Sequence, residues 1–286
     1  MTLTTKKPLA VFAATLIATC CSSAAFAQIQ ARTFDSPEQA ASALIGAASK
    51  DDTRELTAIL GSAAQGILTS GNAAQDTEER QEFSKLATTK NQVEHSSMDS
   101  TTAVLLVGAE GWPFPIPLAR TGQKWSFDAA RGAVELRARK IGGNELDAIE
   151  MCAAYVGAQE EYAAQKSSPA GVHAYAQSLM SLNQRKAASG DLIPEDGKPY
   201  HGYYFRVIKE QGPNAPGGAH KYVAGGAMIG GFALVAWPAE YGATGIHTFI
   251  VNHDGEIYEK DFGPRTVTLT PSIARYDPDS SWTAVE

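Results

Sequence analysis

The side chains best suited to hold a ligand or a partner lie in the last third of this 286-residue chain. Aromatic rings can stack on a ligand, and imidazoles can exchange protons near neutral pH. The candidate groove consists of Tyr200, His201, Tyr204, Trp237, Tyr241 and His247. The competing interpretation is packing, since strand alternation sends Tyr203 and Phe205 to one face and Tyr204 to the other. The pattern predicts a binding groove in which some of these rings also serve as core.

The histidines and cysteines do not form a metal-binding pattern. His201, His247 and His253 could meet at one end of a sheet, but no HExxH or paired-cysteine motif accompanies them. His247 shares a strand face with Phe249 and is expected in the core or at its rim, whereas His253 precedes a turn and is expected to be exposed. We expect neither a metal nor a cofactor.

Other reactive residues lack the surroundings that catalysis requires. Cys152 lies in mid-helix beside Glu150, which predicts a small buried side chain rather than a nucleophile. The glycine-rich run 225–231 lacks the Lys-Ser/Thr ending of a phosphate loop and precedes a strand. Carboxylates with no predictable opposed partner are expected on solvated surfaces; they are Glu160, Glu161, Asp191, Glu195 and Asp196. The catalytic residues of any activity remain unassigned.

The first 27 residues have the pattern of an export signal. Lys6 and Lys7 precede an uncharged, mostly apolar stretch, and Ala25-Phe26-Ala27 supplies the small residues of a cleavage site. The apolar stretch is shorter than the ~20 residues that span a membrane, and no later segment reaches that length. We expect cleavage after Ala27 and a periplasmic or secreted protein. The alternative is a lipoprotein anchored at Cys20.

Composition narrows the classes of partner. The chain has 24 basic and 31 acidic residues, and loss of Lys6 and Lys7 with the leader changes its net charge from −7 to −9. Such an acidic excess argues against nucleic acid as a partner. Because Cys152 alone remains after cleavage, an intramolecular disulfide is excluded. An envelope protein or a small ligand fits these features, and the oligomeric state stays open.

We expect a domain boundary between residues 28–140 and 141–286. The first domain should begin with a helix capped by Ser36 and a short helix over 52–60, followed by a third helix with its cap at Asp76. Strands should follow at 103–107, at a proline-broken edge over 114–118, and where Trp125 and Phe127 share a face. The order of helices and then a meander is similar to the nuclear-transport-factor-2-like superfamily, and it predicts an α+β domain.

The second domain should pack one long helix on an antiparallel sheet. A basic, glycine-containing junction over 131–143 precedes Asn144, which should cap a helix running to about Lys166. A short helix is expected within 174–182, and strands over 203–209, 232–237, 246–251 and 256–260. Asp254-Gly255 predicts a turn with positive φ at both residues, and the Gly/Pro-rich stretch 212–231 predicts a mobile loop. The fold class is α+β with two domains.

Four strings in the chain resemble a bacterial family. They are Gly111–Leu118 (GWPFPIPL), Ile141–Leu146 (IGGNEL), Pro199–Phe205 (PYHGYYF), and Gly230–Gly242 (GGFALVAWPAEYG) followed by Thr248–Asn252 (TFIVN). Together they resemble the family called domain of unknown function 2950 over the mature chain, a resemblance that implies no activity. Many relatives carry a longer insert between positions matching Leu182 and Lys198, so any site built from that insert would be missing.

The C-terminal half alone resembles the globular head of type IV pilin-like proteins. An Ala-rich helix opens at Asn144-Glu145, and Ala236-Trp237-Pro238 leads to the turn at 252–255. Pilins begin this helix with about 20 apolar residues, whereas Arg139 and Lys140 precede it here. The resemblance implies a soluble relative or an accessory part of such an assembly.

The function expected from these features is binding rather than catalysis. Every familiar catalytic signature is missing from the sequence, and the pilin-like order favours a binding or cell-envelope assembly protein. The alternative is a hydrolase or small-ligand enzyme with a site near His201, Tyr241 and His247.

Overall fold

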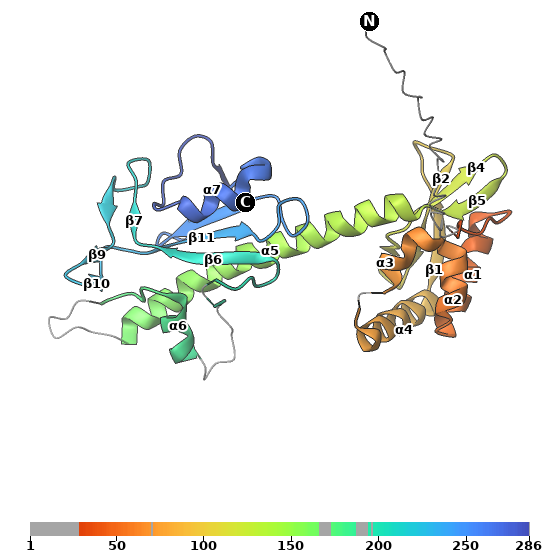
Figure 1. Ribbon diagram of the computed structural model, residues 1–286, viewed down its shortest axis with the longest axis horizontal. Helices are drawn as coiled ribbons and strands as arrows, with labels where there is room; N and C mark the ends of the chain where they lie inside the picture. Colours follow the sequence, from red (N-terminus) through yellow and green to blue (C-terminus); the bar gives the residue numbers. More distant parts are fainter. Residues whose placement is uncertain (1–28, 70, 166–172, 187–193, 196, 286) are drawn as a thin grey trace, which may run out of the picture. The chain divides into compact units, whose positions relative to one another are not determined.

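A computed structural model describes residues 29–69, 71–165, 173–186, 194–195 and 197–285. The chain divides into two compact units, which are described separately (Figure 1). Unit 1 extends to Trp112 and includes Leu118–Phe127, and unit 2 comprises Pro113–Pro117 and the chain from Asp128 onward. The expected leader, its cleavage site at Ala27 and Cys20 lie outside the described residues, as do Asp191 and Asp196.

Unit 1 packs helices against an antiparallel sheet. The helices are α1 (Pro37–Ser49), α2 (Thr53–Leu60), α3 (Gln65–Leu68) and α4 (Ala73–Thr89). The strands are β1 (Asn91–His95), β2 (Thr102–Val107), β3 (Trp112–Pro113), β4 (Leu118–Thr121) and β5 (Lys124–Phe127). They pair in the order β1-β2-β4-β5, and β3 pairs with β2. The expected order of helices followed by a meander is confirmed.

Helix starts in unit 1 follow the side chains that can cap them. Ser36 Oγ accepts from Gln39 N at 3.2 Å, which confirms the predicted cap. Asp52, predicted as the first residue of the second helix, is instead its N-cap and accepts from Glu55 N at 2.9 Å. The predicted cap at Asp76 is wrong. Asn72 takes an extended conformation and caps α4 four residues earlier, because the intervening Ala and Gln residues favour helix.

The strands of unit 1 alternate as expected only where apolar residues dominate. Ala103, Leu105 and Val107 are buried in β2, and Trp125 and Phe127 are buried in β5. The proline-rich piece 114–117 forms no strand, since proline cannot donate to the ladder. Strand β1 was not predicted, because its polar residues are mostly exposed at the sheet edge.

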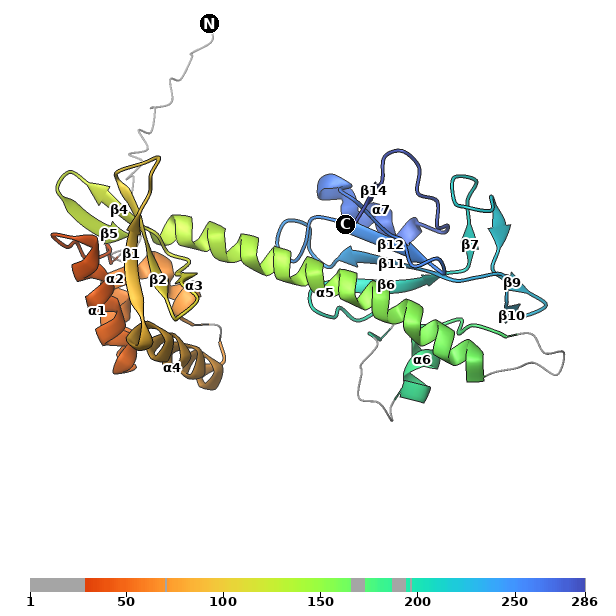
Figure 2. The same cartoon turned by 180° about the vertical axis from the view of Figure 1, so that it is seen from behind.

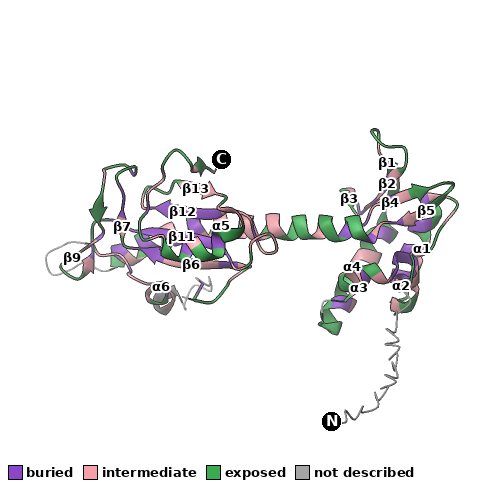
Figure 3. Cartoon of the chain, turned by 45° about the horizontal axis from the view of Figure 1, so that its top comes forward, coloured by how far each residue is buried: buried purple, intermediate pink, exposed green. Residues whose placement is uncertain are grey.

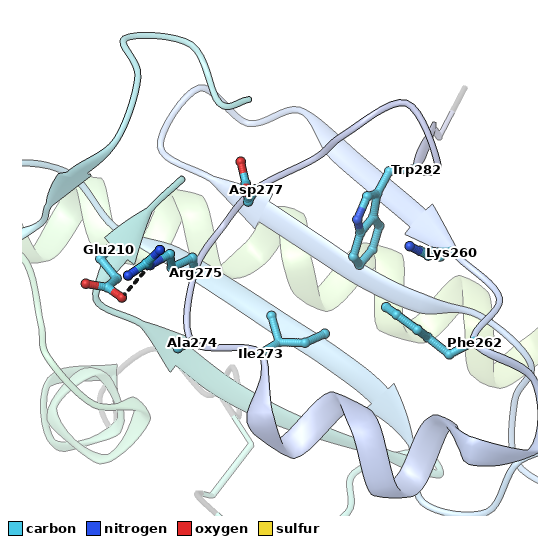
Figure 4. A pocket seen from close by; sticks show the side chains of 8 residues that line it. All are labelled: Glu210, Lys260, Phe262, Ile273, Ala274, Arg275, Asp277 and Trp282. Atoms are coloured by element: carbon cyan, nitrogen blue, oxygen red, sulfur yellow. Dashed lines mark hydrogen bonds and ion pairs between the residues drawn. The ribbon is translucent and has the colours of Figure 1, made fainter. Parts of the chain in front are cut away.

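Unit 2 is a five-stranded antiparallel sheet between a long helix and shorter segments. The strands are β6 (Tyr203–Ile208), β11 (Ala233–Pro238), β12 (Thr248–Asn252), β13 (Ile257–Lys260) and β14 (Thr283–Ala284), in the order β14-β13-β12-β11-β6. The helices are α5 (Ala129–Gln165), α6 (Leu179–Lys186) and α7 (Thr266–Leu269). Figure 2 shows α5 running along one face of this sheet, and Figure 4 shows α7 in front of the opposite face.

The core of unit 2 lies between α5 and the sheet, where the buried residues of β11 and β12 gather (Figure 3). Tyr203 pairs in register with Pro238 and its ring meets Phe249, 5.9 Å away between centroids. On the helix, Cys152 and Tyr155 are fully buried, and Tyr155 Oη donates to Ala233 O at 3.4 Å. The predicted helix-on-antiparallel-sheet architecture is confirmed.

Helix α5 begins 15 residues earlier than the sequence suggests. The expected junction over 131–143 is wrong, since these residues are helical and the expected boundary at 140/141 falls inside α5. The Ala, Glu, Leu, Arg and Lys residues of this stretch favour helix strongly enough to outweigh Gly142 and Gly143, at about 1 kcal/mol each. Asn144 therefore caps nothing. Neither α5 nor any other described helix is both long and apolar enough to cross a membrane.

The glycine-rich stretch 212–231 contains regular secondary structure. It contains β8 (His220–Lys221), β9 (Val223–Ala224) and β10 (Ala227–Met228), and β8 pairs with β7 (Glu210–Gln211). Buried Tyr222 donates to Gln211 Oε1 at 2.8 Å, and Gln211 Nε2 donates to two carbonyls of the stretch. Short strands and buried polar contacts are therefore present where the sequence predicted an irregular loop.

The β12–β13 hairpin also differs from its prediction. Gly255 alone has positive φ, at 82°, while Asp254 does not. Gly255 N donates to Asn252 O at 3.0 Å, so the turn spans 252–255, and the glycine follows its two central residues.

Candidate functional site

Two of the predicted site residues, His201 and His247, are paired with carboxylates of α5. His201 Nδ1 lies 2.5 Å from Asp147 Oδ2, and His247 Nδ1 lies 3.2 Å from Glu145 Oε1. A carboxylate at Nδ1 orients an imidazole and leaves its Nε2 for other partners. His201 and Glu145 belong to strings that carried the family resemblance, and Asp147 and His247 each lie directly beside one.

His201 owes its position to a two-residue hairpin turn. Tyr200 and Tyr203 exchange backbone hydrogen bonds of 2.8 and 2.9 Å, and both His201 (φ 46°) and Gly202 (φ 77°) are left-handed. This is the geometry of a type I′ turn, which favours glycine at its second position. The ring of Tyr200 stacks on that of His201 with 4.2 Å between centroids.

Glu145 is occupied by structural contacts. Its Oε1 accepts from the backbone N–H groups of Ile246 and His247 at 2.8 and 3.0 Å. Tyr203 Oη donates to His247 O at 2.9 Å, and burial raises the pKa of this phenol. Because one carboxylate oxygen receives both amides and the imidazole, Glu145 fastens the start of β12 to α5 instead of serving as a free base.

The other three predicted residues lie elsewhere. Tyr204 and Trp237 contact each other, 5.7 Å between ring centroids, on strand positions opposite to those that face α5. Tyr241 Oη donates to Asp261 Oδ2 at 3.3 Å. The structure therefore pairs two histidines with α5, places Tyr204 and Trp237 on the far face of the sheet, and directs Tyr241 toward the segment after β13.

His253 was expected to be exposed, and this expectation is wrong. Its ring packs edge-on against Tyr222 at 5.9 Å and Phe232 at 6.1 Å. Its Nδ1 is buried and has no hydrogen-bond partner among the residues that the structure describes. Across the described ranges, no group of three or more His, Cys, Asp or Glu side chains could hold a metal ion.

Cys152 is fully buried, and burial raises the pKa of its thiol to about 12. The chain with Cys20 and Cys21 replaced by serine should react with a thiol reagent at pH 8 about 1,000-fold more slowly when native than when denatured, since thiolate is the reacting form. The measurement is the rate of labelling. Ala153→Cys in a Cys152→Ala background, one position along the helix and exposed, should label quickly. If Cys152 and the cysteine of the Ala153→Cys variant were labelled at the same rate in the native protein, the buried thiol would be contradicted.

An open groove on the face of the sheet opposite α5 is the site that the sequence did not reveal (Figure 4). Its volume is about 450 Å³. It is lined by Glu210, Lys260, Phe262, Ile273, Ala274, Arg275, Asp277 and Trp282. We call it the C-terminal groove. The end of β13, the segment after α7 and the last residues of the described chain position its walls.

Two aromatic rings and a lysine form one end of the C-terminal groove. Phe262 and Trp282 meet edge to face, with 5.7 Å between ring centroids. Lys260 Nζ lies 4.8 Å from the Phe262 centroid and 5.6 Å from that of Trp282, within the range of cation–π attraction. The lysine also donates to Ser281 Oγ at 2.6 Å. This end can hold an apolar ring beside a positive charge.

The other end of the C-terminal groove is polar and internally paired. Arg275 Nε lies 2.9 Å from Glu210 Oε1, and this contact raises the pKa of the guanidinium. Asp277 Oδ1 accepts from Asn214 N and Nδ2 at 2.8 and 3.1 Å. Between the ends, Ile273 supplies an apolar surface (Figure 4).

Sequence patterns gave a weak signal for this groove. Alternation along β13 places Tyr258 and Lys260 on one face, and Phe262 comes two residues later. Trp282 lies 20 residues farther along, after segments without strand or helix periodicity, so its contact with Phe262 depends on the tertiary fold.

Comparison with known proteins gives one family. The family model described as Protein of unknown function (DUF2950) matches residues 31–191 and 183–285. No curated protein matches the chain, and no solved structure does.

Proposed function

This chain belongs to DUF2950, a family of unknown function, and we propose that it is an exported, non-catalytic binding protein of the cell envelope. The observation that carries the proposal is the C-terminal groove, an open cavity with an aromatic pair at one end and charged side chains at both. Ligand sites typically combine such apolar walls with a few placed polar groups, and 450 Å³ is within their usual range.

The chemistry of the groove favours binding over turnover. Its acidic side chains are engaged, Glu210 by Arg275 and Asp277 by Asn214, so neither is placed as a free acid or base. Cys152 is buried in the core between α5 and the sheet. The groove can therefore hold a molecule through stacking and charge. Its acidic lining residues are fixed by their contacts with Arg275 and Asn214.

Export is supported by the pattern of the first 27 residues. The basic pair Lys6-Lys7, the apolar stretch and the small residues before Gln28 are the features that an export signal needs. The periplasm or the exterior would then be the compartment in which the groove meets its ligand.

A hydrolase is the second candidate function. The observation that favours it is the pair of imidazoles held at Nδ1 by carboxylates, His201 by Asp147 and His247 by Glu145. Tyr241, the third residue of that hypothesis, contacts Asp261 instead.

The proposed function is tested with protein purified from the periplasm of a Gram-negative host. Native mass spectrometry should find the mature chain beginning at Gln28, with a bound small molecule that Trp282→Ala loses and Trp112→Ala retains. Trp112 is exposed in unit 1 and serves as the matched control. A ligand-free protein, or equal retention by both variants, would overturn the groove as the site. Turnover of envelope components abolished by His201→Ala would favour the hydrolase.

A further inference from the structure

Lys260 is the cation of the C-terminal groove that has no close counterion among the described residues, whereas Arg275 pairs with Glu210. Along the described chain, no carboxylate lies within 4 Å of its Nζ, and its hydrogen bond goes to the neutral Ser281 hydroxyl. Asp279 interacts with it at longer range, and the side chain of Ser281 donates to that carboxylate. At close range the lysine ammonium therefore meets the neutral Ser281 hydroxyl and two aromatic rings.

A second cation lies beneath the groove. Arg206 is half-buried on β6, and burial lowers the pKa of its guanidinium. It donates to the backbone oxygen of Ile273 at 2.6 Å, while its Nε is buried without a partner in the part of the chain that the structure describes. At the other end of the groove Arg275 pairs with Glu210, and Asp277 adds a negative charge there, so the positive charge of the groove is concentrated at the surface formed by Lys260, Phe262 and Trp282. An anionic group is the complement of that surface.

We propose that the C-terminal groove binds a small organic carboxylate with a planar apolar body. Phe262, Trp282 and Ile273 contact the body, and the ammonium of Lys260 pairs with the carboxylate. This inference rests on the proposed function, since it names the ligand class for the same groove.

The geometry selects this class on three counts. The edge-to-face rings of Phe262 and Trp282 expose aromatic surface on which a flat ligand can stack. The volume of about 450 Å³ accommodates a compound of two fused rings. Lys260 presents a compact single positive charge beside the two rings, where it can pair with one carboxylate.

The test compares 2-naphthylacetate with 2-naphthylacetamide, which differ only in charge and hydrogen bonding at one end. Binding to the full chain is measured by chemical-shift titration at millimolar ligand. We expect the acid to bind about five- to tenfold more tightly, because hydrogen bonds to charged groups are stronger than neutral ones. Lys260→Met keeps the apolar stem of the lysine and should abolish that preference. Lys221→Met, an exposed lysine of β8, should preserve it.

The outcomes distinguish the inference that the ligand is a carboxylate from the proposal that the C-terminal groove is a binding site. Equal binding of acid and amide to the unaltered chain would overturn the carboxylate inference and leave the groove as a binding site. Binding of neither compound would overturn the inference and count against the groove itself. Weaker binding of the acid at high salt, with the amide unchanged, would support the role of Lys260. Because the first comparison uses the unaltered chain, it does not depend on the folding of any variant.

Discussion

Replacing Gln159 by leucine is expected to lower the free energy of unfolding of unit 2 by about 2–5 kcal/mol. Gln159 is fully buried on α5, where its Nε2 donates to Tyr155 Oη at 2.7 Å and to Ala176 O at 2.9 Å. Its Oε1 accepts from Ala176 N at 2.8 Å. Leucine matches the volume but leaves the buried N–H and C=O of Ala176 without partners, and each such group costs about 1–3 kcal/mol.

The measurement is urea unfolding followed by tryptophan fluorescence in a Trp112→Phe, Trp125→Phe background. The remaining tryptophans, Trp237 and Trp282, both belong to unit 2. Glu160→Leu, at the adjacent exposed position of α5, should change stability by less than about 0.5 kcal/mol. A loss below that value for Gln159→Leu would mean that the amide does not hold Ala176 to the helix.

Gly245→Ala is expected to destabilise unit 2 by about 2–4 kcal/mol through overpacking. A Cβ at this position would lie 2.1 Å from Tyr203 Oη and 2.5 Å from its Cζ. The tyrosine cannot turn away freely, since it is fully buried and bonded to His247 O. The substitution must therefore displace a core ring or the backbone at the start of β12.

Two further variants distinguish the steric overlap with Tyr203 from the general effect of replacing glycine by alanine on stability. Gly157→Ala lies in α5 with nothing within 4 Å of the added Cβ, and it should stabilise by about 0.5–1 kcal/mol. Tyr203→Leu removes the ring, so adding Gly245→Ala to it should cost little more. Additive losses in the double variant would show that the damage does not arise from the Tyr203 contact.

Local signals in the sequence were reliable where one residue determines one contact. Ser36 and Asp52 cap their helices because their side chains reach an N–H three residues ahead. Trp125 and Phe127 share a buried face because strand geometry alternates. The α+β class followed from such local patterns, together with the order of helices and strands.

The predictions failed where the structure depends on the summed helix propensity of a whole stretch, or on a contact between residues far apart in the sequence. Gly142 and Gly143 suggested a break, but the whole stretch around them favours helix. The pairing of His201 with Asp147 joins residues 54 apart, which no spacing rule anticipates. Likewise, the predicted groove residues include Tyr204 and Trp237, which lie on the face of the sheet opposite α5. The cavity that the structure contains is lined instead by other residues, among them Lys260, Phe262 and Trp282.

The close approach at Gly202 has an evolutionary consequence. A Cβ there would lie 2.6 Å from Asn144 Nδ2 and 2.9 Å from Thr244 Cβ, while Asn144 itself donates to Thr244 O at 2.8 Å. A side chain at 202 would therefore require both Asn144 and Thr244 to move. The residue types tolerated at position 202 thus depend on the residues at two positions distant in the sequence, 144 and 244.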